Sequence, residues 1–334
     1  MYEQFYNFSA MSFQLTPDSR FFFSSKGHSR AIAHLIYGLS QGEGFIIVTG
    51  EVGAGKTTLV ERLWSELDRD TYTLARISTT QVSGDDLFRL TMAAFGIEAD
   101  DYDKSTLLTR FGEMLAEHRA SGRHCLLVVD EAQNLSLQAL EELRMLSNLT
   151  EGGRASLQTI LLGQPQFRRK LASPDLDQLR QRVLASYHLG PLATEETQSY
   201  IEHRLTAVGW QNDPTWSSGA FAAVFRHTGG IPRRINRLCS RVLLYGALEE
   251  SHAITGHIVD NTARELAADL EGDGTGEAAA VVTGSNGIGR PGPDYGVMLR
   301  RIESLEEGMA RRERLLQRLM DMVGGFSTAE GQPR

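Results

Sequence analysis

The sequence predicts an α/β protein in which a parallel sheet is covered by helices and is followed by a small all-helical lid domain. Two features predict this class. Over residues 1–190, short apolar runs rich in β-branched side chains alternate with segments of helical spacing, as strands and crossover helices do. From Thr194 onward the helical pattern continues alone. We therefore expect an α/β domain over residues 1–190 and a helical lid over residues 191–270.

Residues 1–44 precede the first strand and form an N-terminal segment of the α/β domain. Aromatic residues are dense around Thr16 and Asp18, and three of them follow at positions 21–23. These rings either pack in the core or cover a bound adenine ring, and the sequence leaves both roles open. A helix comes next, with an apolar face expected at Ile32, Leu35, Ile36 and Leu39.

A glycine-rich loop lies between the first expected strand, Phe45–Thr49, and a segment of helical spacing, Thr58–Trp64. It fits the phosphate-loop pattern G-x-x-x-x-G-K-[S/T] in full, with Gly50, Glu51, Val52, Gly53, Ala54, Gly55, Lys56, Thr57 and Thr58. Glycines let backbone N–H groups surround a β-phosphate at the positive end of the next helix. Lys56 would add a charge on the β- and γ-phosphate oxygens, and Thr57 would offer a hydroxyl to Mg²⁺. The loop therefore predicts a site for ATP and Mg²⁺.

Two carboxylates, Asp130 and Glu131, end an apolar strand that begins at Cys125. Neither would be tolerated inside a buried sheet, so both should emerge at its carboxyl edge, where such sheets bind ligands. There Asp130 would hold Mg²⁺ through water, and Glu131 would polarise the water that attacks the γ-phosphate. The elements before them are a strand and two helices, expected over Tyr72–Ile77, Asp85–Phe95 and Ser105–Arg119.

Gln164 stands at the mouth of the next apolar strand, Leu157–Leu162, which follows a helix expected over Leu137–Leu149. Its amide would orient the attacking water between Glu131 and the γ-phosphate. The alternative is a turn residue ahead of Pro165.

Two arginines, Arg180 and Arg182, precede the last expected strand, Ala185–Leu189. Guanidinium suits a γ-phosphate because it is always charged and binds oxygens in a planar fork. Since Lys56 already serves the chain's own loop, such an arginine is more useful in a neighbouring subunit's site. An ordinary surface salt bridge is the competing interpretation.

Four helices are expected in the second domain, over Thr194–Leu205, Phe221–Arg226, Pro232–Gly246 and Gly256–Leu270. Glycines and Pro232 carry Arg233 to the start of a helix, where its charge can point back at bound phosphate. Arg233, Arg237 and Arg241 also recur every four residues. That stripe is either a solvated face or a surface that touches DNA.

The remaining sequence is a glycine-rich linker over residues 271–296 and an amphipathic or coiled-coil helix over residues 297–324. Docking on a partner or self-association is favoured for this helix over binding to a membrane surface, because acidic residues dilute its basic charge.

Composition excludes several protein classes. The formal net charge of −8 argues against a general nucleic-acid coat. Cys125 and Cys239 are the two cysteines, each inside an apolar pattern, so packed thiols are expected rather than a disulfide or a metal pair. No apolar run has the length of a membrane span, and no signal peptide is evident. We expect a cytoplasmic protein, with attachment to the inner membrane only through partners.

With these motifs in place, residues 1–270 resemble an AAA+ ATPase. More narrowly, they are similar to the ExeA/GspA-type secretion ATPases, which share Ala132-Gln133-Asn134-Leu135 after the acidic pair, Gly163-Gln164-Pro165, and Gly229-Gly230-Ile231-Pro232-Arg233. The N-terminal Phe13-Gln14-Leu15-Thr16-Pro17-Asp18 resembles the exosortase-associated subfamily, found beside exopolysaccharide genes.

The resemblance implies a role for each motif residue. It implies that Lys56 and Thr57 bind the nucleotide and Mg²⁺ and that Asp130 and Glu131 are the Walker B pair. It also implies that Gln164 is sensor 1, that Arg182 is the trans-acting arginine finger and that Arg233 is sensor 2. One departure is that the secretion proteins continue into a membrane span and a peptidoglycan-binding module, where this sequence has a linker and a short helix.

The functional hypothesis is a homo-oligomerising ATPase that supports an envelope secretion or exopolysaccharide export machine. The alternative is a DNA-associated AAA+ regulator of the transposition type. A small-molecule phosphotransferase is disfavoured by the adjacent Asp130 and Glu131 and by the helical domain with Arg233.

Overall fold

The computed structural model describes residues 2–16, 18–78, 83–99, 102–151, 154–155 and 157–272. Residues Met1–Ala267 form one compact unit and Ala268–Arg334 a second. The predicted linker over 271–296 and the predicted helix over 297–324 lie, apart from residues 271 and 272, outside the described residues.

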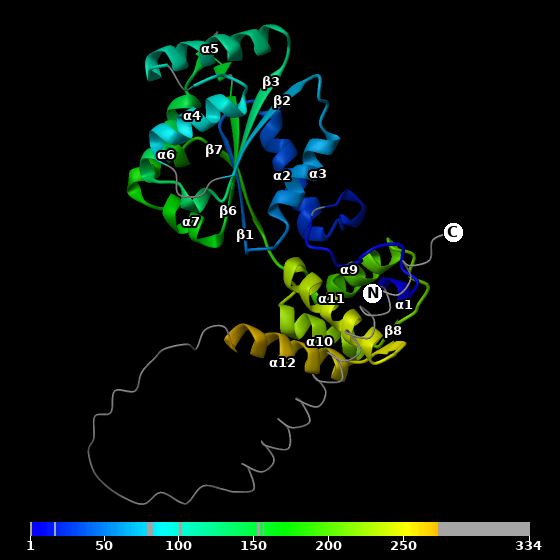
Figure 1. Ribbon diagram of the computed structural model, residues 1–334. Helices are drawn as coiled ribbons and strands as arrows, with labels where there is room; N and C mark the ends of the chain where they lie inside the picture. Colours follow the sequence, from blue (N-terminus) through cyan, green and yellow to red (C-terminus); the bar gives the residue numbers. More distant parts are fainter. Residues whose placement is uncertain are drawn as a thin grey trace, which may run out of the picture. The chain divides into compact units, whose positions relative to one another are not determined.

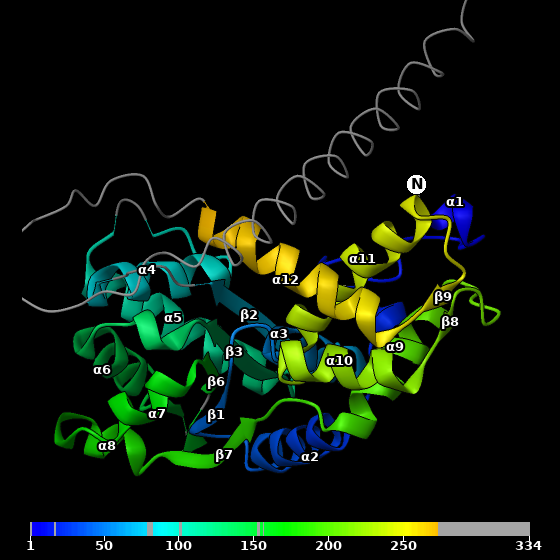
Figure 2. The ribbon, with the colours of Figure 1, turned by 90° about the horizontal axis from the view of Figure 1, so that it is seen from below.

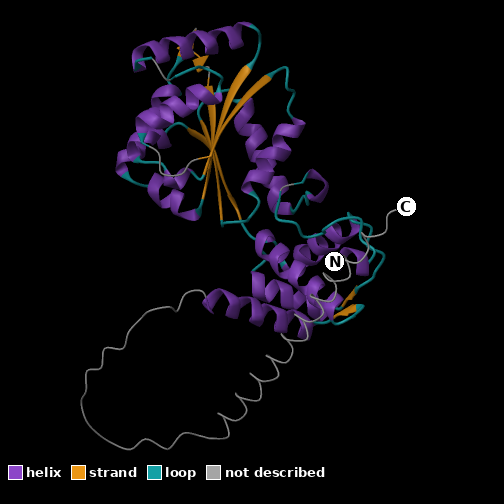
Figure 3. Ribbon diagram, viewed as in Figure 1, coloured by secondary structure: helices purple, strands orange, loops and turns teal. Residues whose placement is uncertain are grey.

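A five-stranded parallel sheet forms the centre of the first unit, in the order β2-β3-β6-β1-β7 (Figure 1, Figure 3). Its strands are β1 Phe45–Gly50, β2 Tyr72–Ser78, β3 His124–Asp130, β6 Leu157–Gly163 and β7 Val183–Leu189. Each expected strand is present. β1 and β6 are buried along their whole length because strands flank both edges and helices cover both faces. The predicted α/β class is therefore confirmed.

Helices cover the two faces of this sheet (Figure 1). One face carries α2 Lys26–Ser40 and α3 Lys56–Glu66; the other carries α4 Gly84–Ala94, α5 Lys104–Ala120, α6 Leu137–Leu146 and α7 Pro165–Leu171. Alternate side chains of each strand point to opposite faces. Ile46 of β1 accordingly packs in the cluster of α2 and α3. Its neighbour Phe45 packs in the cluster that contains Phe111 of α5.

Two details of these helices differ from expectation. Ile36 is 49% exposed, because α2 buries Ala31, Leu35 and Leu39, and position 36 falls beside that stripe. Helix α7 was not expected, because Pro165 looked like the end of a turn. Pro165 instead occupies the first turn of α7, where its missing N–H costs nothing, and Phe167 anchors the helix in the core.

The region after β7 is mainly helical, as expected. It contains α9 Thr194–Thr206, α10 Ser218–Thr228, α11 Pro232–Leu248 and α12 Gly256–Gly272, with two short parallel strands, β8 Thr215–Trp216 and β9 Ala253–Ile254. The short elements elsewhere are α1 Tyr2–Phe5, α8 Asp177–Arg180, the strands β4 Thr150–Glu151 and β5 Arg154–Ala155, and 3-10 turns at Ser19–Phe21, Ala132–Asn134 and Pro174–Leu176.

The N-terminal segment packs on these lid helices (Figure 2). Phe8, Phe13 and Phe21 are buried in one cluster with apolar residues of α9, α10 and α11. Phe21, Phe22 and Phe23 also line a cavity, and Phe23 packs against the same cluster. Several of these aromatic residues are therefore in the core, whereas a cover over an adenine ring stays a prediction for those that line the cavity.

Both cysteines are buried free thiols, as expected. Burial raises the pKa of Cys125 to about 11. Among the described helices, none combines the length and the apolar character that a membrane crossing requires.

Candidate nucleotide-binding site

The predicted phosphate loop is the turn between β1 and α3, at the carboxyl edge of the sheet. Gly53 and Gly55 adopt backbone φ angles of +82° and +98°, which residues other than glycine rarely adopt. A Cβ at Gly53 would lie 2.3 Å from the Cβ of Arg233, and the Arg233 N–H donates to the Gly53 carbonyl at 3.2 Å. The loop therefore contacts the first turn of α11 directly, and glycine is required for that contact.

Lys56 is the buried cation of this loop, with 6% of its surface exposed. Its Nζ donates to the carbonyls of Gly50 at 2.9 Å and Glu51 at 3.1 Å. Burial lowers the pKa of Lys56, while the carboxylates of Glu131 and Asp130 act in the opposite direction. An ammonium held in this way lies where phosphate oxygens would meet the loop.

Thr57 and Asp130 form the second part of the site. The Thr57 hydroxyl donates to Asp130 Oδ2 at 2.8 Å, and the Glu131 N–H donates to Asp130 Oδ1 at 2.9 Å. Arg76 of β2 also reaches Asp130 Oδ2, at 3.3 Å. Hydroxyl and carboxylate oxygens are the ligands that Mg²⁺ prefers, so this pair of side chains fits the metal that the loop implies.

Glu131 is held by two amide side chains at the end of β3. Its backbone is left-handed, with φ of +54°, which is uncommon for residues other than glycine. Gln133 donates to Glu131 Oε2, and Gln164 donates to the same oxygen at 3.1 Å. The Gln164 N–H in turn donates to Gln133 Oε1 at 2.9 Å.

These contacts set the charge of Glu131. Burial acts to raise the pKa of this carboxyl, but the hydrogen bonds from Gln133 and Gln164 and the charge of Lys56 bring it below its usual value. Glu131 is therefore ionised at neutral pH. A carboxylate with a fixed direction can accept a proton from a water molecule beside a phosphate.

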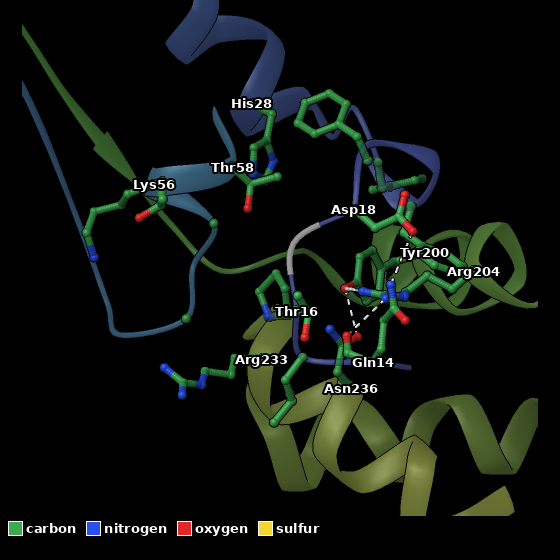
Figure 4. Close-up of a pocket in the computed structure, with 18 of the residues that line it drawn as sticks. Gln14, Thr16, Asp18, His28, Lys56, Thr58, Tyr200, Arg204, Arg233 and Asn236 are labelled. Atoms are coloured by element: carbon green, nitrogen blue, oxygen red, sulfur yellow. Dashed lines mark hydrogen bonds between the residues drawn. The ribbon is translucent and has the colours of Figure 1, made fainter. Parts of the chain in front are cut away.

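A cavity of about 320 Å³ opens beside the loop (Figure 4). Its walls come from the N-terminal segment, the phosphate loop, Glu131, and helices α9 and α11. Figure 4 shows Lys56 and Arg233 on one side of the cavity and Tyr200, Arg204 and Asp18 on the other. The lining thus has Lys56 and Arg233 at one end, and at the other end aromatic and amide groups together with Arg204 and Asp18.

The end of the cavity away from Lys56 rests on a buried arginine, Arg204 of α9, with 6% of its surface exposed. Its guanidinium donates to the carbonyls of Ser12 at 2.7 Å and Gln14 at 3.2 Å, and to the Tyr200 hydroxyl at 2.9 Å. It also lies 4.5 Å from the centre of the Phe21 ring. One side chain of the lid therefore fastens the N-terminal segment that forms this wall.

The structure brings most of the predicted residues together. The predicted residues that line the cavity are Val52, Gly53, Gly55, Lys56, Thr57, Thr58, Glu131 and Arg233. Gln164 and Asp130 are hydrogen-bonded to two of these lining residues, Glu131 and Thr57 respectively. Gly50, Glu51 and Ala54 shape the turn behind that lining.

Arg182 does not join its own chain's site. Its carbonyl accepts from the N–H of Phe45, at the amino end of β1, whereas the loop begins at the carboxyl end, roughly 17 Å away at about 3.3 Å per residue. Arg182 donates to the Ser147 carbonyl at 3.4 Å and forms no ion pair within the described residues. Arg180, by contrast, forms an exposed salt bridge with Asp177.

Several site residues escaped the sequence reasoning. Gln133 is predicted only as part of a family motif, and no sequence signal distinguishes Arg76 within its strand. Tyr200 and Arg204 did carry a signal, because both are polar residues four positions apart on the apolar face of α9. His28 had a weaker one, as the third residue after the helix-capping Ser25.

Comparison with known proteins agrees with this architecture. Residues 39–171 match the family model of an AAA domain. The chain is 35% identical over 286 residues to general secretion pathway protein A of Aeromonas hydrophila, covering 84% of this chain and 51% of that protein. It thus spans about half the length of this relative. The chain therefore carries an AAA domain and is related to a secretion pathway protein.

Solved structures of low sequence identity share the fold. The Aeropyrum pernix ORC2 protein, in ADPNP-ADP complexes, aligns with a TM-score of 0.58 at 14% identity, covering 77% of this chain and 72% of that chain. Cdc6p from Pyrobaculum aerophilum aligns with a TM-score of 0.58 at 16% identity, covering 75% and 71%. These likenesses show the P-loop NTPase fold alone. None of these matches concerns the exosortase-associated subfamily, which stays a prediction.

Proposed function

We propose that this protein binds ATP with Mg²⁺ and hydrolyses it to ADP and phosphate. The observation that carries the proposal is the convergence on one cavity of a glycine loop with a buried lysine, a threonine–aspartate pair, and a glutamate fixed by two amides. A glycine turn that only joined strand to helix would not need the other two groups.

Each residue has a distinct task in this mechanism. The loop N–H groups and Lys56 bind the phosphates, and Arg233 adds a second cation from the lid. Thr57 and Asp130 would hold Mg²⁺, which supplies positive charge to the β- and γ-phosphate oxygens. Glu131 accepts a proton from the attacking water. The oxygen of that water bonds to the γ-phosphorus while the bond from the γ-phosphorus to the bridging oxygen breaks and ADP leaves. Gln164 and Gln133 act on the reaction by keeping Glu131 in position.

Glu131→Gln tests this mechanism. The amide is close to the carboxylate in size but cannot take the proton, so hydrolysis should fall by at least ~100-fold while ATP stays bound. Phosphate release and nucleotide affinity would be measured on the same preparation. Glu113→Gln, an exposed position on α5, is the control for a lost carboxylate. Near-normal turnover in Glu131→Gln would show that Glu131 is not the proton acceptor for the attacking water.

We further propose that the protein works as a homo-oligomer in which Arg182 enters the neighbouring subunit's site. Its distance from its own phosphate loop and its lack of an ion pair within the described residues support this assignment over Arg180. Nucleotide-driven assembly would then support an envelope secretion or exopolysaccharide export machine. The name of the Aeromonas hydrophila relative supports the secretion part of this proposal.

DNA association is the second candidate. Arg237 and Arg241 of the predicted stripe are exposed on α11, as a DNA-facing surface requires. The net charge of −8 opposes it. Binding that weakens steeply with salt, because phosphate contacts release counterions, would favour DNA association. If the protein does not bind DNA at physiological salt, the DNA candidate is excluded and the export proposal stands.

A further inference from the structure

His28 is a buried residue of the cavity wall that the mechanism above does not use. It lies in the first turn of α2, with 6% of its surface exposed, and its ring packs edge-on against Phe22 at 5.8 Å between centroids. A Cβ at Gly55 would lie 2.9 Å from His28 Nε2, so this ring atom borders the phosphate loop. Figure 4 shows the ring beside Thr58.

The contacts of Ser25 determine which ring nitrogen carries the proton. The Ser25 hydroxyl oxygen accepts the N–H of His28 at 3.1 Å and lies 2.7 Å from His28 Nδ1. The proton of the Ser25 hydroxyl has no other acceptor among the described residues, so this hydroxyl donates to His28 Nδ1. Nδ1 therefore accepts, and in the neutral ring Nε2 carries the hydrogen. Burial lowers the pKa of His28, although Glu196 acts to raise it, so the ring is neutral at pH 7.

The Nε2–H group has no acceptor among the described residues, and although the residue is only 6% exposed, Nε2 is not one of its fully buried atoms. A donor at the wall of a cavity can bond to water or to a ligand that enters the cavity. Nε2 borders Gly55, and the ring is part of the cavity lining. The group is therefore aimed at whatever occupies the cavity next to the loop.

The position along the cavity indicates which atoms it meets. Lys56 serves the end where β- and γ-phosphates would lie, and Thr16, Tyr200 and Asn236 line the opposite end. His28 lies beside Thr58, between these two ends (Figure 4). In a nucleotide, the α-phosphate joins the other phosphates to the sugar and base.

We propose that His28 binds the nucleotide directly, by donating a hydrogen bond from Nε2 to an oxygen of the α-phosphate. Ser25 is the positioning residue that fixes the ring in the required tautomer. The inference rests on the proposed function, since it requires ATP or ADP in this cavity. Because both nucleotides have an α-phosphate, the contact strengthens the binding of both by the same factor.

Two substitutions at this position separate the donor from the bulk of the ring. His28→Leu keeps an apolar group against Phe22 but removes the donor, and His28→Gln restores an N–H near the position of Nε2. His34→Leu, an exposed position on the same helix, is the matched control. Dissociation constants of ADP and ATP with Mg²⁺ would be measured by calorimetry, and folding by thermal unfolding without nucleotide.

We expect His28→Leu to weaken ADP and ATP binding equally, by about 10-fold to 100-fold, the range for a lost hydrogen bond to a charged group. His28→Gln should stay within a few-fold of wild type, and His34→Leu should match it. In the unchanged protein, nitrogen NMR of labelled histidine should show a protonated Nε2 whose resonance shifts when ADP binds.

Distinct outcomes would overturn the inference and the proposed function. Wild-type affinity in His28→Leu, or a ring protonated at Nδ1, would overturn the role of His28 while leaving ATP binding intact. A wild-type protein that binds neither nucleotide would instead refute the proposed function. If His28→Leu fails to fold, the NMR measurement and His28→Gln decide the question, and an Nε2 resonance unmoved by ADP counts against the contact.

Discussion

Gly53→Ala provides a sharp test of the contact between the phosphate loop and the lid. The added Cβ would lie 2.3 Å from the Cβ of Arg233. An ordinary carbon–carbon contact is about 3.5 to 4.0 Å, so the loop and α11 must move apart by about 1.2 to 1.7 Å. The hydrogen bond from the Arg233 N–H to the Gly53 carbonyl is already 3.2 Å long and would break.

Two costs contribute to the expected effect of this substitution. The left-handed backbone of Gly53 penalises any Cβ by about 1 to 2 kcal/mol, partly offset by the lower entropy of the unfolded chain. The lost hydrogen bond adds about 1 kcal/mol. The separation also withdraws the Arg233 cation from the cavity, so nucleotide affinity should fall along with stability.

Gly122→Ala and Gly96→Ala isolate the contact, because both glycines have similar φ, +78° and +81°, and a Cβ there meets nothing within 4 Å. They should show the backbone cost alone, with unchanged affinity for ADP and ATP. Urea unfolding without nucleotide and calorimetric binding would be compared across the three variants. Equal unfolding free energies and equal affinities would refute a direct contact between loop and lid.

Two further predictions concern the subunit interface and the lid. Arg182→Ala should bind ATP but lose turnover, and mixing it with Lys56→Ala chains should restore some activity in phosphate-release assays, because an intact arginine then meets an intact loop; no rescue would count against a shared site. Arg204→Leu should lower the free energy of unfolding by about 3 kcal/mol, because it leaves the Ser12 and Gln14 carbonyls without their donor. Urea unfolding checks this, and a change below about 1 kcal/mol would show that the N-terminal segment is held by other contacts.

The sequence alone determined the elements whose signals are local. The order of strand, glycine loop and helix is contained in one continuous stretch, and the structure follows it from Phe45 to Glu66. Asp130 and Glu131 were predictable as edge residues because charge is not tolerated inside a buried strand. Helix α7 was missed because the proline that opens it has the same local signature as a turn.

The tertiary structure decided which distant residues share the site. Arg76 reaches Asp130 only because β2 pairs with β3 in the register that sets Ser78 beside Asp130. Two amides meet on one oxygen of Glu131 only because β3 and β6 end side by side.

The phosphate loop shows the same division most clearly. Its own pattern predicts phosphate binding, because glycines and a lysine act through their local backbone. That His28 and Arg233 border its glycines depends on how α2 and α11 pack, which no local periodicity encodes. Local chemistry was therefore determined by the sequence, whereas the partners of each group were determined by strand register and helix packing.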